Sequence, residues 1–299
     1  CWVKPNSSQS MPVLNPASEM QIGTITLGNE VDVDAAVAAA TKAFSTYSKS
    51  SKAERLQLLK RLMTGTQERF EDLAQAMSAE MGAPISMARD AHADAAVGHL
   101  QGFIEALEKL EERDVLANGD VQVYEPIGVC GLITPWNWPM NQIALKVVPA
   151  LATGCTCVLK PSEHTPISAM IYAEIIHGAG YPAGVFNLVQ GDGLTVGTTL
   201  SRHPDVQMMS FTGSTRAGTA VTRDAADTIK RVTLELGGKS PNIIFADCDL
   251  DKRVTASIDE GMYNTGQSCD APTRLLVERS CLGEVLKIAK RAANATDVG

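Results

Sequence analysis

Hydrophobic residues recur at two different spacings along the chain, and the change of spacing divides it into regions. Near the amino terminus, residues 11–32 mix β-branched residues with Asn-Pro and glycine turn signals, which predicts short antiparallel strands. From residue 32 onward, apolar residues recur at the three- and four-residue spacing of amphipathic helices. The predicted helices span residues 32–48, 52–82 and 87–112.

Beyond residue 121 the pattern changes to short β-rich segments that alternate with helical ones. This alternation is typical of βαβ units and predicts an α/β fold with a Rossmann-like parallel sheet flanked by helices. Glycine or proline stands at most of the junctions between segments. The predicted strands are 121–134, 155–160, 184–191, 206–211, 231–238, 240–245 and 273–278, and the predicted helices are 142–153, 166–180, 193–203, 214–226, 251–264 and 283–295.

Composition narrows the functional classes. The chain has 26 Lys and Arg against 34 Asp and Glu, a formal net charge of −8, and no dense basic stripe, so nucleic-acid binding is not expected. No apolar run is long enough for a membrane span. The seven scattered cysteines indicate reduced thiols and a cytoplasmic location, although a chain that begins at Cys1 leaves a targeting segment upstream open. His92 and His99 lack a third ligand, and no metal is expected.

Two loops at predicted strand ends carry polar candidates, and ligands of doubly wound sheets bind at such ends. The first loop, ITPWNWPMN, holds Asn137 between rigid residues. Either the loop is only a packed corner, or the Asn137 side chain is a fixed amide donor for an oxyanion. The second, LKPSEHTP, carries Lys160 and Glu163. This pair is either a solvated turn or a binder of the vicinal hydroxyls of a nucleotide ribose.

Two further strand ends offer an anion site and a carboxylate. In SFTGSTRAG, Ser214 begins a predicted helix between Gly213 and Gly218, which indicates a phosphate site or simply close helix–strand packing. In LELGGKSP, Glu235 follows an apolar stretch. It could form a surface salt bridge, bind a ribose in the way of the Rossmann fingerprint, or act as a general base. Cys269, in GQSCDAPTR, is by itself a structural thiol or a nucleophile.

The order of these stretches is more specific than any one of them. PWN, LKPSE, FTGS, LELGGK and GQSC follow one another as in the NAD(P)-dependent aldehyde dehydrogenase superfamily, which the chain resembles from NPASEMQIGTI to GQSCDAPTR. The resemblance implies a dinucleotide-binding domain at 1–107 and 127–237, part of a β oligomerisation element at 108–126, and the incomplete start of a second α/β catalytic domain at 238–299. It also implies a homodimer or homotetramer for the full-length form.

The resemblance assigns the chemistry to four residues. Cys269 would attack a small-molecule aldehyde, and Asn137 would help to hold the oxyanion of the thiohemiacetal. Glu235 would activate the water that hydrolyses the thioester, and Lys146 matches a lysine tied to proton relay. Trp138 and Gln142 match positions near the substrate tunnel.

The resemblance also implies a cofactor and its contacts. Lys160 and Glu163 match the ribose-binding pair, and Ser214 and Trp136 match the pyrophosphate contacts. A carboxylate at position 163 would repel a 2′-phosphate, so NAD is expected over NADP. The other implied cofactor contacts are Ile133, Thr134, Gly193, Phe211, Gly213 and Leu236.

Two departures from the family pattern limit these expectations. The family continues past residue 299 to a Glu-Ile/Val-Phe-Gly-Pro stretch that is absent here, so the 299 residues are expected to be poorly active alone. Asp270 stands beside Cys269, where an anion disfavours the thiolate unless its side chain turns away. The alternatives are a CoA-acylating relative, against which Glu235 argues, and a non-catalytic nucleotide-binding or structural fragment.

Overall fold

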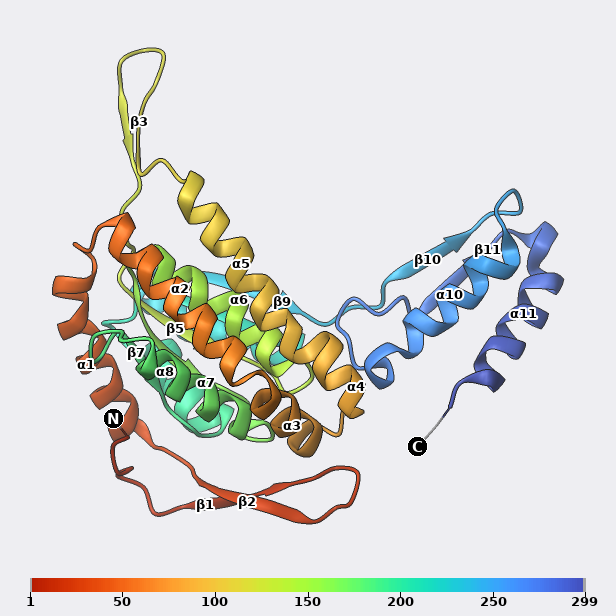
Figure 1. The fold of residues 1–299 in the computed structure, drawn as a ribbon, viewed down its shortest axis with the longest axis horizontal. Coiled ribbons are helices and arrows are strands. Elements are labelled where there is room, and N and C mark those ends of the chain that lie inside the picture. Colours follow the sequence, from red (N-terminus) through yellow and green to blue (C-terminus); the bar gives the residue numbers. More distant parts are fainter. Residues whose placement is uncertain (1, 298–299) are drawn as a thin grey trace. The chain divides into compact units, whose positions relative to one another are not determined.

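The chain divides into two compact units, Cys1–Glu235 and Leu236–Gly299 (Figure 1). The computed structural model describes residues 2–297. Each unit has its own sheet and its own apolar cluster. The assignment of residues 1–107 and 127–237 to a dinucleotide-binding domain, of 108–126 to an oligomerisation element and of 238–299 to a catalytic domain stays a prediction.

The larger unit is built on a five-stranded sheet with the strand order β7-β6-β5-β8-β9. Strand β5 pairs in parallel with both β6 and β8, and β6 pairs in parallel with β7, which confirms the predicted α/β class. Every residue of β5 and β6 is buried, as expected for central strands covered on both faces. The strands are β5 (Val129–Ile133), β6 (Thr156–Lys160), β7 (Phe186–Leu188), β8 (Met208–Gly213) and β9 (Arg231–Leu236).

Helices cover this sheet on both faces. The chain runs from β5 to β6 and β7 through α6 and α7, and it then returns to the other side of β5 through α8 and α9. Because parallel crossovers are right-handed, this reversal places α8 and α9 on the face opposite α6 and α7. The helices are α6 (Pro139–Ala152), α7 (Pro166–Gly178), the π-helical turn η2 (Gly193–Gly197), α8 (Thr198–Arg202), α9 (Thr215–Ala225) and the 3-10 turn η3 (Ala226–Thr228).

The amino-terminal helices complete the two layers. Helix α1 contacts β5, β6 and β7 as well as α8, whereas α2, α3 and α5 pack against α6 or α7. Capping boxes at Asn29 and Ser51 begin α1 and α2. The single helix predicted over 52–82 is divided at Arg69, and the one predicted over 87–112 begins with a π-helical segment. The elements are α1 (Glu30–Tyr47), α2 (Lys52–Glu68), α3 (Phe70–Met81), α4 (Ile85–Met87), η1 (Ala88–Ala93) and α5 (Asp94–Lys109).

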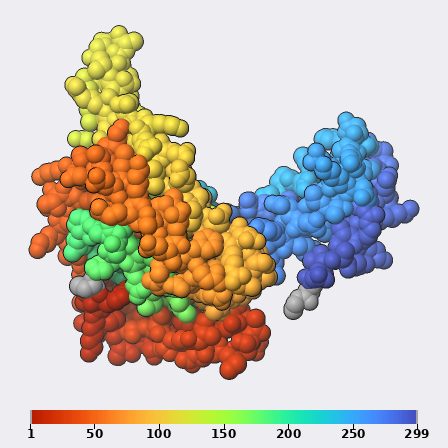
Figure 2. Space-filling model, in the orientation of Figure 1, coloured from red at the N-terminus to blue at the C-terminus, as the bar shows by residue number. Residues whose placement is uncertain are grey.

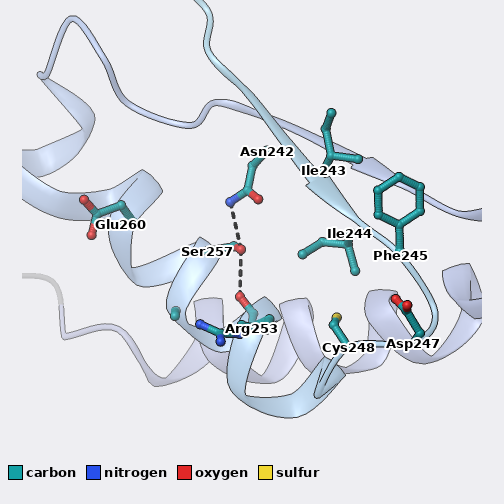
Figure 3. A pocket seen from close by; sticks show the side chains of 10 residues that line it. Asn242, Ile243, Ile244, Phe245, Asp247, Cys248, Arg253, Ser257 and Glu260 are labelled. Carbon is teal, nitrogen blue, oxygen red and sulfur yellow. Dashed lines mark hydrogen bonds between the residues drawn. The ribbon is translucent and has the colours of Figure 1, made fainter.

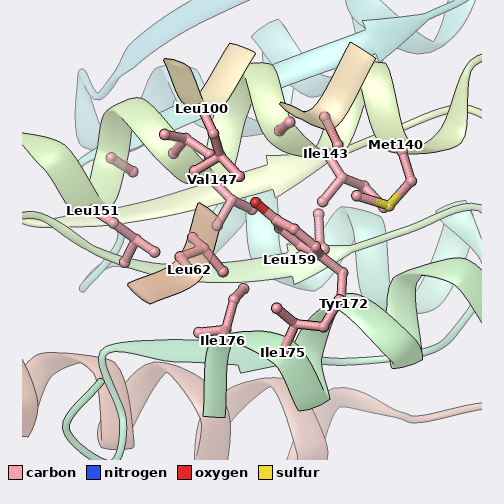
Figure 4. Close-up of a cluster of buried hydrophobic side chains, with 14 of the residues drawn as sticks. Leu62, Leu100, Met140, Ile143, Val147, Leu151, Leu159, Tyr172, Ile175 and Ile176 are labelled. Carbon is pink, nitrogen blue, oxygen red and sulfur yellow. The ribbon is translucent and has the colours of Figure 1, made fainter. Parts of the chain in front are cut away.

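The main apolar core is shared by the sheet, by α6 and α7, and by the amino-terminal helices that pack against them. Figure 4 shows side chains of α2, α5, α6, β6 and α7 meeting there. The labelled residues are Leu62, Leu100, Met140, Ile143, Val147, Leu151, Leu159, Tyr172, Ile175 and Ile176. None of the helices within residues 2–297 combines bilayer-spanning length with a sufficiently apolar composition.

Two antiparallel hairpins lie outside the helical layers. Strands β1 (Ser10–Leu14) and β2 (Gln21–Thr26) form the first, as predicted for this part of the chain. The second pairs β3 (Arg113–Val115) with β4 (Val121–Val123), and all residues of both strands are exposed. Figures 1 and 2 show this second hairpin standing out from the rest of its unit.

The smaller unit has a two-stranded parallel sheet and two long helices. Its apolar cluster contains Ile244, Val254, Cys281, Val285 and Ile288. The elements are β10 (Pro241–Ile244), α10 (Leu250–Met262), the 3-10 turn η4 (Tyr263–Gly266), β11 (Arg274–Val277), the 3-10 turn η5 (Arg279–Cys281) and α11 (Leu282–Ala295).

A close approach between backbones makes substitution of one glycine of the larger unit costly. Gly184 has φ +85°, and a Cβ there would lie 2.5 Å from the carbonyl oxygen of Ala39 in α1. We expect Gly184→Ala to lower the free energy of unfolding by about 1–3 kcal/mol or more. Gly178→Ala is the matched control, because a Cβ at Gly178 meets no atom within 4 Å. Equal urea midpoints for the two variants would contradict this account.

Candidate functional site

The register of the sheet gathers the predicted loops of the larger unit at one edge. Ile133, at the end of β5, pairs with Lys160 of β6 on one side and with Phe211 of β8 on the other. The chain leaves β5 in one direction and returns on its other side, so this edge contains the topological switch point. The loops that follow β5, β6 and β8 therefore emerge beside one another, at the place where doubly wound sheets bind ligands.

Lys160 is held at this edge by three oxygen atoms. Its ammonium donates to the carbonyls of Pro161 at 2.8 Å and Gly191 at 2.7 Å, and to the Glu163 carboxylate at 3.1 Å. Burial lowers the pKa of Lys160, and the negative charges of Glu163 and Asp192 oppose that shift. The Glu163 side chain remains 25% exposed. The sequence-predicted pair is thus a fixed ion pair with an accessible carboxylate.

The turn after β8 presents a helix amino terminus to solvent. Ser214 is the N-cap of α9, and its hydroxyl accepts a hydrogen bond from the Ala217 N–H at 3.2 Å. Ser214, Thr215 and Arg216 are exposed, and an exposed helix amino terminus is a type of site that can bind an anion. A Cβ at Gly213 would lie 2.6 Å from the Phe211 ring, so a larger residue there would require that ring to move.

The loop after β5 carries the two tryptophans. Trp136 is 41% exposed, whereas Trp138 stacks on the buried ring of His92 with centroids 4.2 Å apart. His92 belongs to the π-helical segment η1, and such segments are frequent at functional sites. Asn137 lies between these tryptophans in the sequence, two positions before α6 begins at Pro139.

Lys146 and Gln142 project from α6 onto β8. The Lys146 ammonium donates to the Ser210 hydroxyl at 3.0 Å, and the Gln142 side-chain oxygen accepts a hydrogen bond from the Thr212 hydroxyl at 3.0 Å. Both side chains are buried. Burial lowers the pKa of Lys146 to about 8, against the attraction of Glu235. A lysine with this pKa can release and recover a proton near neutral pH.

Glu235 and Cys269 are exposed, and they belong to different units. In the smaller unit, Gly238 of the LELGGK stretch approaches the backbone of Cys269, because a Cβ at Gly238 would lie 3.4 Å from the Cys269 carbonyl oxygen. The cysteine follows a turn in which Asn264, Thr265 and Gly266 all have positive φ. Leu236, Gly193 and Asp270 are also partly or fully exposed.

A pocket of the smaller unit lies away from these residues. A pocket of about 450 Å³ lies along β10 and α10, where Asn242 donates to the Ser257 hydroxyl at 2.8 Å (Figure 3). It is lined by Ile243, Phe245 and Cys248 among others, and contains none of the predicted site residues. Among the described residues, no group of three or more His, Cys, Asp or Glu side chains could hold a metal ion.

Sequence reasoning missed three polar residues around the site. Ser210 and Thr212 alternate along a buried strand and carry no signal of their own. Glu80 lies in the apolar pattern of a helix, and its burial is visible only in the folded chain.

Fold and site together define a doubly wound α/β protein with charged and polar side chains at the switch point and an exposed thiol. The family model described as "Aldehyde dehydrogenase family" matches residues 2–299. The chain belongs to the aldehyde dehydrogenase family, which confirms the resemblance seen in the sequence.

Named relatives agree with this membership. The chain is 50% identical to a 3-succinoylsemialdehyde-pyridine dehydrogenase of a Pseudomonas species, matching all of this chain and 62% of that protein. The aldehyde dehydrogenase of Bartonella henselae superposes with a TM-score of 0.98 at 48% identity, and the match covers 100% of this chain and 63% of that one. A variant of aldehyde dehydrogenase C from Pseudomonas syringae was solved with NAD⁺ and octanal, and it also superposes with a TM-score of 0.98. Its sequence identity is 47%, and the match covers 100% of this chain and 61% of that one. The chain thus spans about 62% of the length of the curated relatives that it matches.

The buried charge of Lys146 predicts a pH-dependent stability difference. The pKa is about 8 in the folded chain and 10.5 in the unfolded chain, so the unfolded chain holds more protons between these values and stability rises with pH there. Lys146→Met should therefore raise the free energy of unfolding at pH 7, by up to about 3 kcal/mol. The gain over wild type should shrink between pH 8 and 9.5 in urea titrations.

The control is Lys42→Met, an exposed lysine of α1. Its difference from wild type should not depend on pH. If the stability gain of Lys146→Met over wild type stayed constant between pH 8 and 9.5, it would contradict the lowered pKa of Lys146.

Proposed function

We propose that this protein catalyses the NAD-dependent oxidation of an aldehyde to a carboxylic acid. The chain belongs to the aldehyde dehydrogenase family, and it contains both an exposed Cys269 thiol and a Lys160–Glu163 ion pair at the switch point. The presence of both features in one chain is the observation that carries the proposal. The NAD⁺ and octanal in the Pseudomonas syringae structure support the same cofactor and substrate class.

The residues at the carboxyl edge fit a dinucleotide. The Thr134 hydroxyl is buried at the end of β5 and has no hydrogen-bond partner among the described residues, which leaves it available to a ligand. In our proposal Lys160 and Glu163 bind a ribose, and the first turn of α9 at Ser214 binds the pyrophosphate beside Trp136. The remaining proposed contacts are Ile133, Gly193, Phe211, Gly213 and Leu236. NAD supplies the acceptor for the hydride that leaves the aldehyde carbon.

The chain's own groups carry the acyl chemistry. The Cys269 thiolate attacks the carbonyl carbon, and the Asn137 amide with the Cys269 N–H holds the oxyanion. Once the carbon is oxidised, the acyl group stays on sulfur as a thioester. Glu235 takes a proton from the water that hydrolyses the thioester. Lys146, with its pKa of about 8, takes part in relaying that proton. Trp138 and Gln142 are proposed near the substrate.

The oligomeric state and location belong to the same proposal. The β3–β4 hairpin exposes Val115, Val121, Val123 and Tyr124, an apolar surface that supports pairing between copies of the chain in a homodimer or homotetramer. The thiols recorded for the described residues are all free, which favours the cytoplasm.

Trapping the acyl group tests the mechanism. In the whole protein, Glu235→Gln should give a burst of NADH of about one equivalent per site, followed by slow turnover, because hydrolysis of the thioester loses its base. Cys269→Ser should give no burst, and Glu68→Gln, an exposed acid of α2, should behave as wild type. Mass spectrometry should find the acyl group on Cys269. Acid formation only when CoA and a second hydrolysis step are supplied would instead favour a CoA-acylating enzyme.

The cofactor preference is tested at Glu163. A carboxylate beside the ribose repels a 2′-phosphate, so Glu163→Gln should lower the ratio of kcat/KM for NAD over NADP by about tenfold, equivalent to about 1.4 kcal/mol. Glu174→Gln, on the exposed side of α7, is the matched control and should leave the ratio unchanged. Similar kcat/KM values for both cofactors in the wild type would refute the preference for NAD.

A further inference from the structure

One buried carboxylate takes no part in the proposed chemistry. Glu80 of α3 is 3% exposed, and burial raises its pKa to about 7. No ion pair with a described residue compensates it, and the only groups that favour its charge are N–H and O–H donors from Ile167 and Ser168. Burying a carboxylate costs free energy of folding unless hydrogen bonds or an opposite charge compensate it. The hydrogen bonds of Glu80 are therefore the feature that needs an explanation.

Both oxygens of Glu80 receive hydrogen bonds from the first turn of α7. Oε2 accepts from the Ile167 N–H at 2.6 Å, and Oε1 accepts from the Ser168 N–H at 3.0 Å. The Ser168 hydroxyl donates to Oε1 as well. The partners lie 87 and 88 positions along the chain from Glu80, so the contact ties two distant helices together.

These donors are the ones that an N-cap side chain normally satisfies. Thr165 is the N-cap of α7 but forms no side-chain capping bond, and Pro166 at the first helical position has no N–H. The donors at the second and third positions belong to Ile167 and Ser168, and Glu80 takes both. Glu80 is therefore the cap of α7, and its negative charge also favours the positive end of the helix dipole.

The capped helix directly follows the turn that carries Glu163. At its beginning this turn is fixed by Lys160, which binds two carbonyls and the Glu163 carboxylate. Inside it, the Thr165 N–H donates to the Ser162 carbonyl at 3.2 Å. At its end the chain enters α7, where Glu80 holds the first two available N–H groups. Residues 161–165 are thus anchored at both ends.

We propose that Glu80 is a positioning residue for the cofactor: by capping α7 with both carboxylate oxygens, it fixes the turn that presents Glu163 to the ribose. The proposal rests on the NAD-binding role given above to Lys160 and Glu163. In this proposal Glu80, which is 3% exposed and bonded to the first turn of α7, acts through the helix and the turn before it.

The need for two acceptors makes glutamine an informative substitution. An amide has one acceptor oxygen, so in Glu80→Gln the NH₂ group must face either the Ile167 or the Ser168 N–H, both of which are donors. One capping bond is lost and two donors oppose each other, while side-chain size is kept. Ser168→Ala is a milder variant, because it removes only the hydroxyl donor and keeps both backbone bonds.

The experiment compares NAD binding with turnover in the whole protein. In Glu80→Gln, the Kd for NAD, followed by tryptophan fluorescence, should rise about fivefold, while kcat at saturating NAD stays within about twofold. Amide hydrogen exchange in residues 166–170 should be faster. Ser168→Ala should raise the Kd for NAD and the rate of hydrogen exchange as well, but by less than Glu80→Gln does. The control is Glu54→Gln, which alters the capping box of α2 and should change neither.

The outcomes separate this inference from the proposed function. Faster exchange in residues 166–170 with an unchanged Kd would show that Glu80 serves stability alone and would overturn the proposal. So would a fall in kcat with an unchanged Kd. If Glu80→Gln does not fold, an unchanged Kd in Ser168→Ala despite faster exchange overturns it equally. Failure of the wild-type protein to bind NAD would instead refute the proposed function.

Discussion

The pairing of β5 with β6 and β8 is the constraint on which the rest of the larger unit depends. All residues of β5 and β6 are buried, so a shift of register would expose apolar side chains or bury polar ones. This register aligns Ile133 with Lys160 and Phe211, and it thereby decides which loops meet at the carboxyl edge. The site is thus a consequence of packing: the apolar core sets the positions from which the polar groups reach the ligand.

Three charged side chains are buried around this edge, and each is stabilised in a different way. Lys160 binds carbonyl oxygens and a carboxylate, Glu80 binds helix N–H groups, and Lys146 has the Ser210 hydroxyl and the more distant charge of Glu235. Neutral partners offset burial less fully than opposite charges do, so the pKa of Glu80 and that of Lys146 both move toward neutrality. Lys146 belongs to the proposed proton exchange, whereas Glu80 supports the fold of the neighbouring turn.

Much of this arrangement could be predicted from the sequence, because its signals are local. Periodicity and glycine positions predicted the strands of the sheet, except that the single strand predicted over 121–134 is divided into β4, which lies outside the sheet, and β5. The order of short motifs predicted the family. The contacts of Glu80 could not be predicted, because its partners are 87 and 88 residues away and helical periodicity treats position 80 as one more core position. The division of the helix at Arg69 was missed for a similar reason: apolar spacing continues on both sides of it.

The turn before Cys269 shows what a motif leaves undetermined. Gly266 tolerates positive φ, but Thr265 is β-branched and has φ +56°, a conformation that costs about 1–3 kcal/mol. Such a conformation persists only where its surroundings impose it, and Asn264, which precedes it, is buried. The backbone thus enters the Gln267-Ser268-Cys269 segment along a path that few sequences would adopt. The positive φ angles of Asn264, Thr265 and Gly266 therefore constrain how the backbone reaches Cys269, and the GQSC motif by itself does not reveal this constraint.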